Sequence, residues 1–135
     1  MTLPSGLPER VADPEHLPRF LTQSTRFTAS AAKGSAFLPN PKSRNTSVFR
    51  LDGDAQTLRR TGEEAGLETI RLKGAAIVCA HEIRNAGLDV VASEPPPAHA
   101  NIERWPWNDI DPRIQKAEQL KFANAIAAAS RLVVF

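Results

Sequence analysis

The chain has 135 residues, of which 41% are hydrophobic and 24% are charged, proportions typical of a single globular domain. This length suffices for a core without disulfides or a structural metal, and the single cysteine, Cys79, excludes an intramolecular disulfide and a thiolate metal cluster. The apolar runs are shorter than the ~20 residues of a membrane helix, and the N-terminus lacks a signal-peptide pattern, so we expect a cytoplasmic protein that does not bind membranes.

The net charge is only +2, but the charges are unevenly distributed along the chain. Residues 16–51, which we call the acid-free stretch, contain no Asp or Glu. The basic residues of this stretch are Arg19, Arg26, Lys33, Lys42, Arg44 and Arg50. Such an asymmetry indicates an anionic partner: a nucleic acid, a nucleotide or an acidic protein. The alternative is a solvated basic face that acids elsewhere in the fold balance.

The first half of the chain favours strands. Residues 1–18 contain four prolines and no hydrophobic periodicity, which predicts an extended or disordered arm before a domain of residues 19–135. Thr and Phe are frequent in residues 19–29, RFLTQSTRFTA, so we expect the first strand there. A short second strand is expected at residues 36–38.

A polar turn, KSRN, follows at residues 42–45 and leads into a third strand, TSVFRL, at residues 46–51. The alternation of a strand predicts that Ser47, Phe49 and Leu51 lie on one face. The opposite face then carries Thr46, Val48 and Arg50.

The second half favours helices. Asp54 is a typical N-cap, and it predicts a helix that ends near residue 65, before Gly66. Residues 69–72 are expected to be a short strand or a connector. A second helix is expected at residues 74–86, which end before Gly87, and a strand at residues 88–92.

The clearest helix begins at Asp111-Pro112, where an acidic N-cap precedes proline at the first helical position. We expect its buried side to contain Ile114, Ala117, Leu120 and Ala127. Residues 132–135 are expected to be a terminal strand. Because strands come first and helices alternate with strands later, the sequence predicts an α+β fold (or mixed α/β), with one small sheet and about three helices.

The segment SEPPPAHANIERWPW, residues 93–107, contains three consecutive prolines, His99 and both tryptophans. The prolines favour an extended polyproline II path, which restricts the backbone that carries His99. A restricted side chain of this kind suits a binding or catalytic site. In the structural interpretation, Trp105 and Trp107 anchor the loop on the core while His99 hydrogen-bonds a backbone carbonyl.

The segment PNPKSRNTSVFR, residues 39–50, is the second candidate site, because basic groups and hydroxyls together suit a phosphate. The candidate ligand-binding residues are Lys42, Arg44, Thr46, Ser47 and Arg50, together with Asn101 of the first segment. If the two segments converge, His99 is the general acid or base for a phosphodiester and the basic groups stabilise its charge. The alternative is a polar turn with solvated side chains. Scattered histidines and the absence of a dinucleotide fingerprint predict neither a metal site nor a cofactor.

The strand NTSVFR and the loop HANIERWP resemble those of a group of small uncharacterised bacterial proteins that share a Ser-Val-Phe-Arg strand and a His-Ala-Asn-Ile-x-x-Trp-Pro loop. The resemblance covers most of residues 15–130. It implies a single-domain cytosolic protein, and it implies no particular reaction. It draws attention to the positions Arg44, Thr46, Ser47, Arg50, His99 and Asn101.

We therefore expect a protein that binds nucleic acid or a nucleotide through its basic N-terminal half. A metal-independent phosphodiesterase or nuclease that uses His99 extends this hypothesis. The alternative is a non-catalytic interaction module, a subunit or an inhibitor, whose basic face docks an acidic protein.

Overall fold

The computed structural model describes residues 2–67 and 71–135. These residues form three α-helices and two antiparallel sheets of three strands each, so the fold class is α+β, as expected, with two small sheets instead of one. The first sheet has the order β1-β3-β6, with β1 at His16–Leu21, β3 at Gly74–Cys79 and β6 at Arg131–Val134. The second has the order β2-β5-β4, with β2 at Thr46–Phe49, β5 at His99–Glu103 and β4 at Asp89–Ala92.

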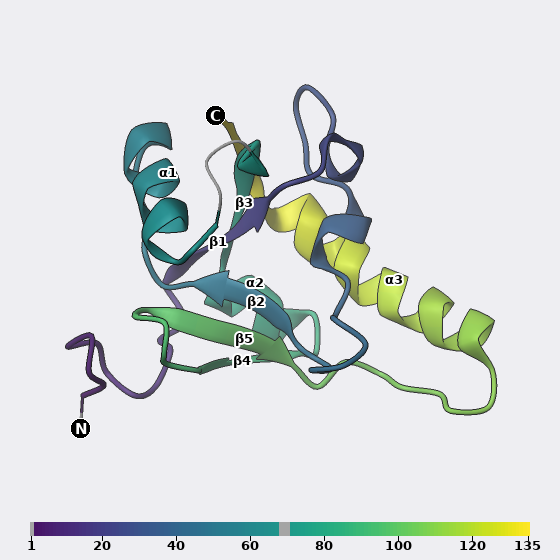
Figure 1. Cartoon of the computed structure of the whole chain (residues 1–135). Coiled ribbons are helices and arrows are strands. Elements are labelled where there is room, and N and C mark those ends of the chain that lie inside the picture. Colours follow the sequence, from purple (N-terminus) through teal and green to yellow (C-terminus); the bar gives the residue numbers. More distant parts are fainter. Residues whose placement is uncertain (1, 68–70) are drawn as a thin grey trace.

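The α-helices are α1 (Ala55–Glu64), α2 (Ala80–Asn85) and α3 (Pro112–Ala129). Figure 1 shows α1 and α3 on opposite sides of the first sheet, with the second sheet beneath it. Between β1 and β2 the chain forms two short 3-10 helices, η1 (Ser24–Arg26) and η2 (Gly34–Phe37). The helix η2 packs against α3.

The helix starts predicted at Asp54 and Asp111 are confirmed, and so are the glycines predicted to end helices, Gly66 and Gly87. The Asp54 carboxylate accepts a hydrogen bond from Thr57 N (2.8 Å), and the Asp111 carboxylate accepts one from Arg113 N (2.9 Å). Gly87 follows α2 with φ +102, a conformation that favours glycine. The strands expected at residues 88–92 and 132–135 correspond to β4 and β6. Residues 69 and 70 of the expected connector lie outside the described residues.

The helix expected at residues 74–86 is wrong in its first half, which forms β3. The strand β3 is buried on both faces and contributes Ala76 and Val78 to the main core and Ala75 and Ile77 to a second cluster beneath α1. A strand that is buried on both faces has a continuous apolar run without alternation. Such a run cannot be told from a buried helix by its periodicity.

The segments expected as strands at residues 19–29 and 36–38 are also corrected. The first strand ends at Leu21, and residues 24–26 form η1. Residues 36 and 37 belong to η2, in which Phe37 is fully buried. The glycine of η2, Gly34, lies so close to α3 that a Cβ atom there would meet Asn124 Oδ1 at 1.9 Å. Packing on α3, which the local sequence does not show, therefore selects the 3-10 conformation.

The segment expected to be a free arm packs against the domain. The strand β1 begins at His16, and Val11, 1% exposed, belongs to the main core. Nearer the N-terminus, Ser5 hydrogen-bonds the Glu94 carboxylate, and the carbonyl of Pro8 accepts a hydrogen bond from Arg50 Nη1 (2.7 Å). Hydrophobic burial and side-chain hydrogen bonds thus replace the missing secondary structure in this segment.

The buried side of α3 differs from the expected one in its first half. The buried residues are Gln119, Ala123, Ile126 and Ala127. Of the four expected residues only Ala127 is buried, and Ile114 is 48% exposed. The reason is visible in Figure 1, where the N-terminal end of α3 extends beyond the sheets. No helix within the described residues combines the length and the hydropathy that a membrane span requires.

Candidate functional site

The pairing of β2 with β5 creates a polar patch on one face of the second sheet. Ser47 lies opposite Asn101 and Phe49 lies opposite His99 in this antiparallel pair. Residues that face each other across two strands project to the same side. The alternation predicted for residues 46–49 is confirmed, because Thr46 and Val48 are buried on the other side.

The His99 ring is held in one orientation by three contacts. Its Nδ1 lies 2.8 Å from the carbonyl oxygen of Ser93, and because a carbonyl only accepts, Nδ1 carries the proton and donates it. In the neutral ring, Nε2 is then an acceptor, and the Ser47 hydroxyl, whose Oγ lies 2.5 Å away, donates to it. The Phe49 ring packs on the imidazole in a T-shaped contact, with ring centroids 5.3 Å apart. The imidazole therefore presents a base to a hydroxyl.

Ser47 and His99 line a cavity of about 630 Å³, which we call the Ser47 cavity. This volume lies in the range of about 300–1,000 Å³ that is usual for small-molecule sites. Asn101, Arg19 and Arg26 also contribute to its wall, and no Asp or Glu does so within the described residues. The cavity is thus polar and cationic.

Arg19 and Arg26, which we call the cavity arginines, are oriented by neutral groups. Arg19 donates to the carbonyls of Ala36 and Ser47, each at 3.0 Å. Arg26 donates to the carbonyl of Ser35 (2.7 Å) and to the side-chain oxygen of Gln23 (3.1 Å). In the part of the chain that the structure describes, neither guanidinium contacts a carboxylate, and the Nη2 atom of each has no hydrogen-bond partner.

The electrostatic environment of Arg19 is unfavourable for its charge. Burial, and secondarily the positive charge of Arg26, lower the pKa of the Arg19 guanidinium. Two half-buried cations near each other, with no described acid between them, repel each other. An anion in the cavity would relieve this repulsion.

A second cavity, of about 360 Å³, adjoins the first and shares with it the residues Arg19, Phe20, Thr22, Ser47 and His99. We call it the apolar cavity, because the residues that line it and not the first cavity are Phe49, Ala65, Leu67 and Pro96. The rings of Phe20 and Phe49 pack on each other with centroids 5.5 Å apart. The Ser47–His99 pair therefore stands where a cationic and an apolar compartment meet.

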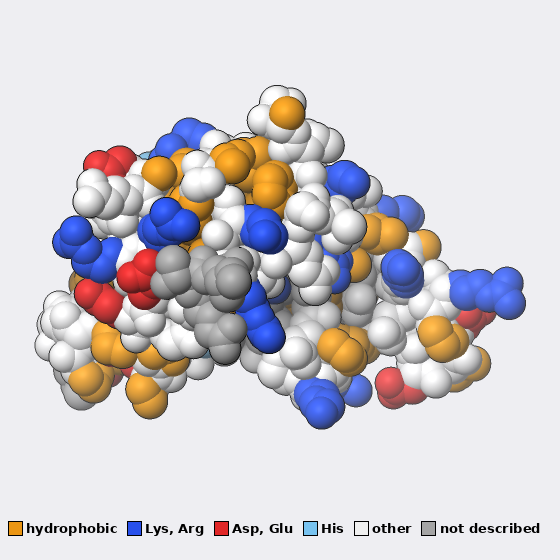
Figure 2. Space-filling view, turned by 45° about the horizontal axis from the view of Figure 1, so that its top comes forward, with side chains coloured by type: hydrophobic (Ala, Val, Ile, Leu, Met, Phe, Trp, Pro, Cys, Tyr) orange, Lys and Arg blue, Asp and Glu red, His pale blue; other side chains and the backbone are white. Residues whose placement is uncertain are grey.

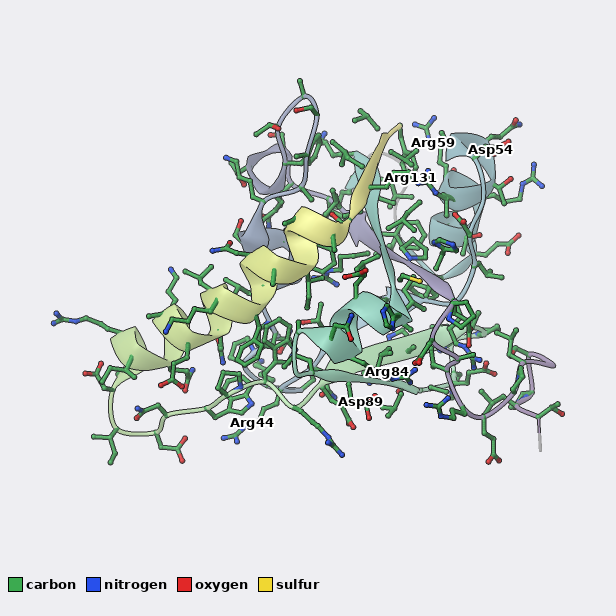
Figure 3. All side chains as sticks on the ribbon, turned by 180° about the vertical axis from the view of Figure 1, so that it is seen from behind. Arg44, Asp54, Arg59, Arg84, Asp89 and Arg131 are labelled. Atoms are coloured by element: carbon green, nitrogen blue, oxygen red, sulfur yellow. The ribbon has the colours of Figure 1, made fainter. Side chains whose placement is uncertain are left out.

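Of the seven residues predicted to form the site, three come together in the Ser47 cavity: Ser47, His99 and Asn101. Lys42 lies exposed in the turn at residues 41–43 and does not line this cavity. Arg44 is exposed as well; its guanidinium lies 4.8 Å from the centroid of the Trp107 ring and 3.8 Å from Asp109. Figure 3 shows Arg44 beside the loop that precedes α3.

Thr46 and Arg50 have structural roles. The Thr46 hydroxyl, 1% exposed, donates to the carbonyl of Phe37 (2.7 Å). Arg50, 5% exposed, donates to both carboxylate oxygens of Glu15, at 2.8 and 3.0 Å. Burial raises the pKa of Glu15, but hydrogen bonds from Arg50 and from Ala12 N outweigh it, so the pKa is lowered overall.

The structural interpretation of the loop at residues 93–107 is confirmed, because Trp107 packs against the main core and His99 donates to the backbone carbonyl of Ser93. Trp105 is 4% exposed and donates from Nε1 to the carbonyl of Ile102 (3.2 Å). The prolines at residues 95–97 do not follow the expected extended polyproline II path, because the chain bends at residues 95 and 96 and turns at residues 97 and 98. Ala98, the last residue of this turn, has φ +63, which is unfavourable for alanine and places His99 at the start of β5.

The sequence interpretation missed Arg19 and Arg26 as site residues, although both belong to the acid-free stretch. The excess of basic residues in that stretch was the available signal. No local pattern distinguishes these two arginines from Arg44 and Arg50, because only the fold decides which guanidinium reaches the cavity. For metals, the described residues contain no group of three or more His, Cys, Asp or Glu placed to hold an ion.

Comparison with known proteins assigns no role to any of these residues. No family model matches the chain, and neither the curated proteins nor the solved structures contain a significant match.

Proposed function

We propose that the protein binds a nucleotide, or one nucleotide unit of a nucleic acid, in the Ser47 cavity. The observation that carries this proposal is the pair of cavity arginines, which line one acid-free cavity and have no carboxylate partner among the described residues. Guanidinium groups bind phosphate with several N–H donors at once. In this proposal the phosphate contacts the free Nη2 atoms of Arg19 and Arg26.

The apolar cavity supports a nucleotide over a simple inorganic anion. It begins at Ser47 and His99, next to the cationic compartment, and the rings of Phe20 and Phe49 form part of its wall. A nucleobase has an apolar, aromatic face that packs on such side chains. A phosphate at the cavity arginines and a base against the two phenylalanines would use both compartments.

The other basic side chains are dispersed, which favours an anion-binding site in a cavity over one on a continuous basic surface. Figure 2 shows Lys and Arg side chains scattered over one face among apolar and polar ones, while Asp and Glu lie toward its ends. Arg44 and Arg50 each have an acidic partner. The alternative, the docking of an acidic protein, would depend on exposed residues such as Lys33 and Lys42.

Isothermal titration calorimetry with a mononucleotide and with a short single-stranded oligonucleotide tests the proposal, at two salt concentrations. We expect Arg26→Gln to weaken binding about tenfold or more, since a hydrogen bond to a charged group contributes about 1.5–3 kcal/mol. Arg19→Gln should act similarly. The matched controls are Arg59→Gln, on α1, and Arg44→Gln, outside the cavity; both should bind as the unchanged protein does.

Two results would contradict the proposal. Equal weakening in Arg26→Gln and Arg44→Gln would indicate a diffuse basic surface, whose binding falls steeply with salt. Failure of both ligands to bind at low salt would refute nucleotide recognition and favour the acidic-protein alternative.

A further inference from the structure

The Ser47–His99 pair has the geometry of an activated nucleophile. The hydroxyl donates to Nε2 over 2.5 Å, and the carbonyl of Ser93 fixes the ring through Nδ1 at 2.8 Å. A hydroxyl, a base and a third group that orients the base are the parts that serine nucleophiles share. Both atoms of the pair belong to residues that line the two adjoining cavities, so a ligand in either cavity lies against them.

We propose that Ser47 is a catalytic nucleophile and that His99 is its general base, acting on a phosphodiester held by the cavity arginines. This inference rests on the proposed binding of a nucleotide phosphate. It adds a covalent intermediate on Ser47, a residue that the sequence interpretation placed only among the ligand-binding residues.

The first step transfers the phosphoryl group to the protein. Ser47 Oγ attacks phosphorus and its proton passes to His99 Nε2. The Oγ–P bond forms, and the bond from phosphorus to the leaving oxygen breaks. That oxygen takes the proton from Nε2 and departs as an alcohol. A phosphodiester of Ser47 remains.

The second step restores the protein. His99 Nε2 accepts a proton from a water molecule, whose oxygen attacks phosphorus. The P–Oγ bond breaks and Ser47 Oγ recovers the proton from Nε2. The products are one alcohol and one phosphate monoester, and nothing is oxidised or reduced.

Two side chains are placed to stabilise the charge on phosphorus. The guanidinium of Arg19 lies beside Ser47, because its Nη1 donates to the Ser47 carbonyl. Asn101 lies opposite Ser47 on the same face, and its side-chain amide has no hydrogen-bond partner within residues 2–67 and 71–135. Donors that are already oriented before the reaction stabilise a developing charge most effectively.

The test uses bis(4-nitrophenyl) phosphate, a chromogenic phosphodiester, with the full chain. We expect a burst of one nitrophenolate per chain, and an adduct of one nitrophenyl phosphate group in the intact mass. Tandem mass spectrometry of peptides should locate this adduct on Ser47 without any substitution. In Ser47→Ala both signals should disappear. Ser30→Ala, an exposed serine outside both cavities, is the matched control and should behave as the unchanged protein does.

His99→Gln tests the base, and we expect it to slow adduct formation by about 100- to 10,000-fold, the usual contribution of a general base. A melting curve for each variant separates loss of chemistry from loss of folding, and the peptide assignment in the unchanged protein does not depend on any variant.

Several outcomes would overturn the inference. If the nucleotide binds but no adduct forms, Ser47 is not a nucleophile while the binding proposal stands. An adduct that maps to another residue, or that persists in Ser47→Ala, would likewise show that Ser47 is not the nucleophile. Labelling of Ser47 by 4-nitrophenyl acetate without labelling by the phosphodiester would refute the substrate class. If no nucleotide binds, the proposed function itself fails.

Discussion

Two pairs of arginines occupy contrasting regions of this protein. Arg50 and Arg84, which we call the paired arginines, tie the N-terminal segment to the domain. Arg84 contacts the carboxylates of Asp13 and Asp89 and donates to the carbonyl of Val11 (2.6 Å). Figure 3 shows Arg84 beside Asp89. The cavity arginines also donate to backbone carbonyls, yet no described carboxylate lies against them.

The presence or absence of a carboxylate partner distinguishes the arginines that stabilise the fold from those that are available to a ligand. A guanidinium that is hydrogen-bonded to carbonyls and neutralised by a carboxylate has little to gain from an external anion. One that is positioned by neutral groups keeps its charge and a free edge for an anion. The following predictions test this contrast from the largest expected effect to the smallest.

Deletion of residues 2–15 should destabilise the protein by about 4 kcal/mol or more, because it leaves Arg50 buried without Glu15 and removes Val11 from the core. Urea unfolding measures the change. An unchanged free energy of unfolding would show that the segment is an independent arm and that Arg50 does not need its carboxylate.

Arg50→Gln should lower the free energy of unfolding by about 3 kcal/mol, since it leaves Glu15 and the carbonyl of Pro8 without their donor. Arg26→Gln should change stability by only about 0.5 kcal/mol or less, because its partners are near the surface. Urea unfolding of both variants gives the comparison directly. Equal losses would erase the distinction between paired and cavity arginines.

The paired arginines also predict how stability depends on pH. The pKa values of Asp13, Glu15 and Asp89 are lowered from their ordinary values of 3.8, 4.5 and 3.8. For Asp13 the hydrogen bond from Arg84 is the main cause. For Glu15 and Asp89 burial is the largest single effect and raises the pKa, but the hydrogen bonds from arginine and from a backbone N–H, together with the arginine charges, outweigh it.

A carboxylate with a lowered folded-state pKa stabilises the protein above its unfolded pKa, and this contribution is lost as the pH falls through the folded value. The free energy of unfolding should therefore decrease as the pH drops below about 4.5. In Arg84→Gln the decrease should be shallower, as thermal melts at a series of pH values would measure. A parallel decrease in both proteins would contradict the assigned role of Arg84.

The smallest expected change in stability comes from giving a cavity arginine a carboxylate partner. Gln23→Glu places a carboxylate at the atom that now accepts from Arg26 Nε (3.1 Å), with almost no change of shape. We expect a stability gain of only ~0.5 kcal/mol, as for a partly exposed ion pair, together with weaker nucleotide binding. Gln56→Glu, an exposed residue of α1, adds the same charge elsewhere and is the control. Unchanged binding in Gln23→Glu would exclude Arg26 from the site.

Features that depend on neighbouring residues could be predicted from the sequence. The caps at Asp54 and Asp111 act within three residues of their own position, and the stop at Gly87 depends on one backbone angle. Alternation likewise placed Ser47 and Thr46 on opposite faces of β2. The α+β class follows from the sum of such local signals.

Features that depend on distant partners were decided by the tertiary structure. The apolar run at residues 74–79 became a strand because α1 and the main core cover both of its faces. His99 reached Ser47, 52 positions away, through the register of β2 and β5. Arg50 became structural because Glu15, 35 positions earlier, lies against it, whereas Arg19 has no such partner among the described residues. One arginine thus differs from another only through what the folded chain brings to it, and an isolated stretch of sequence does not contain that information.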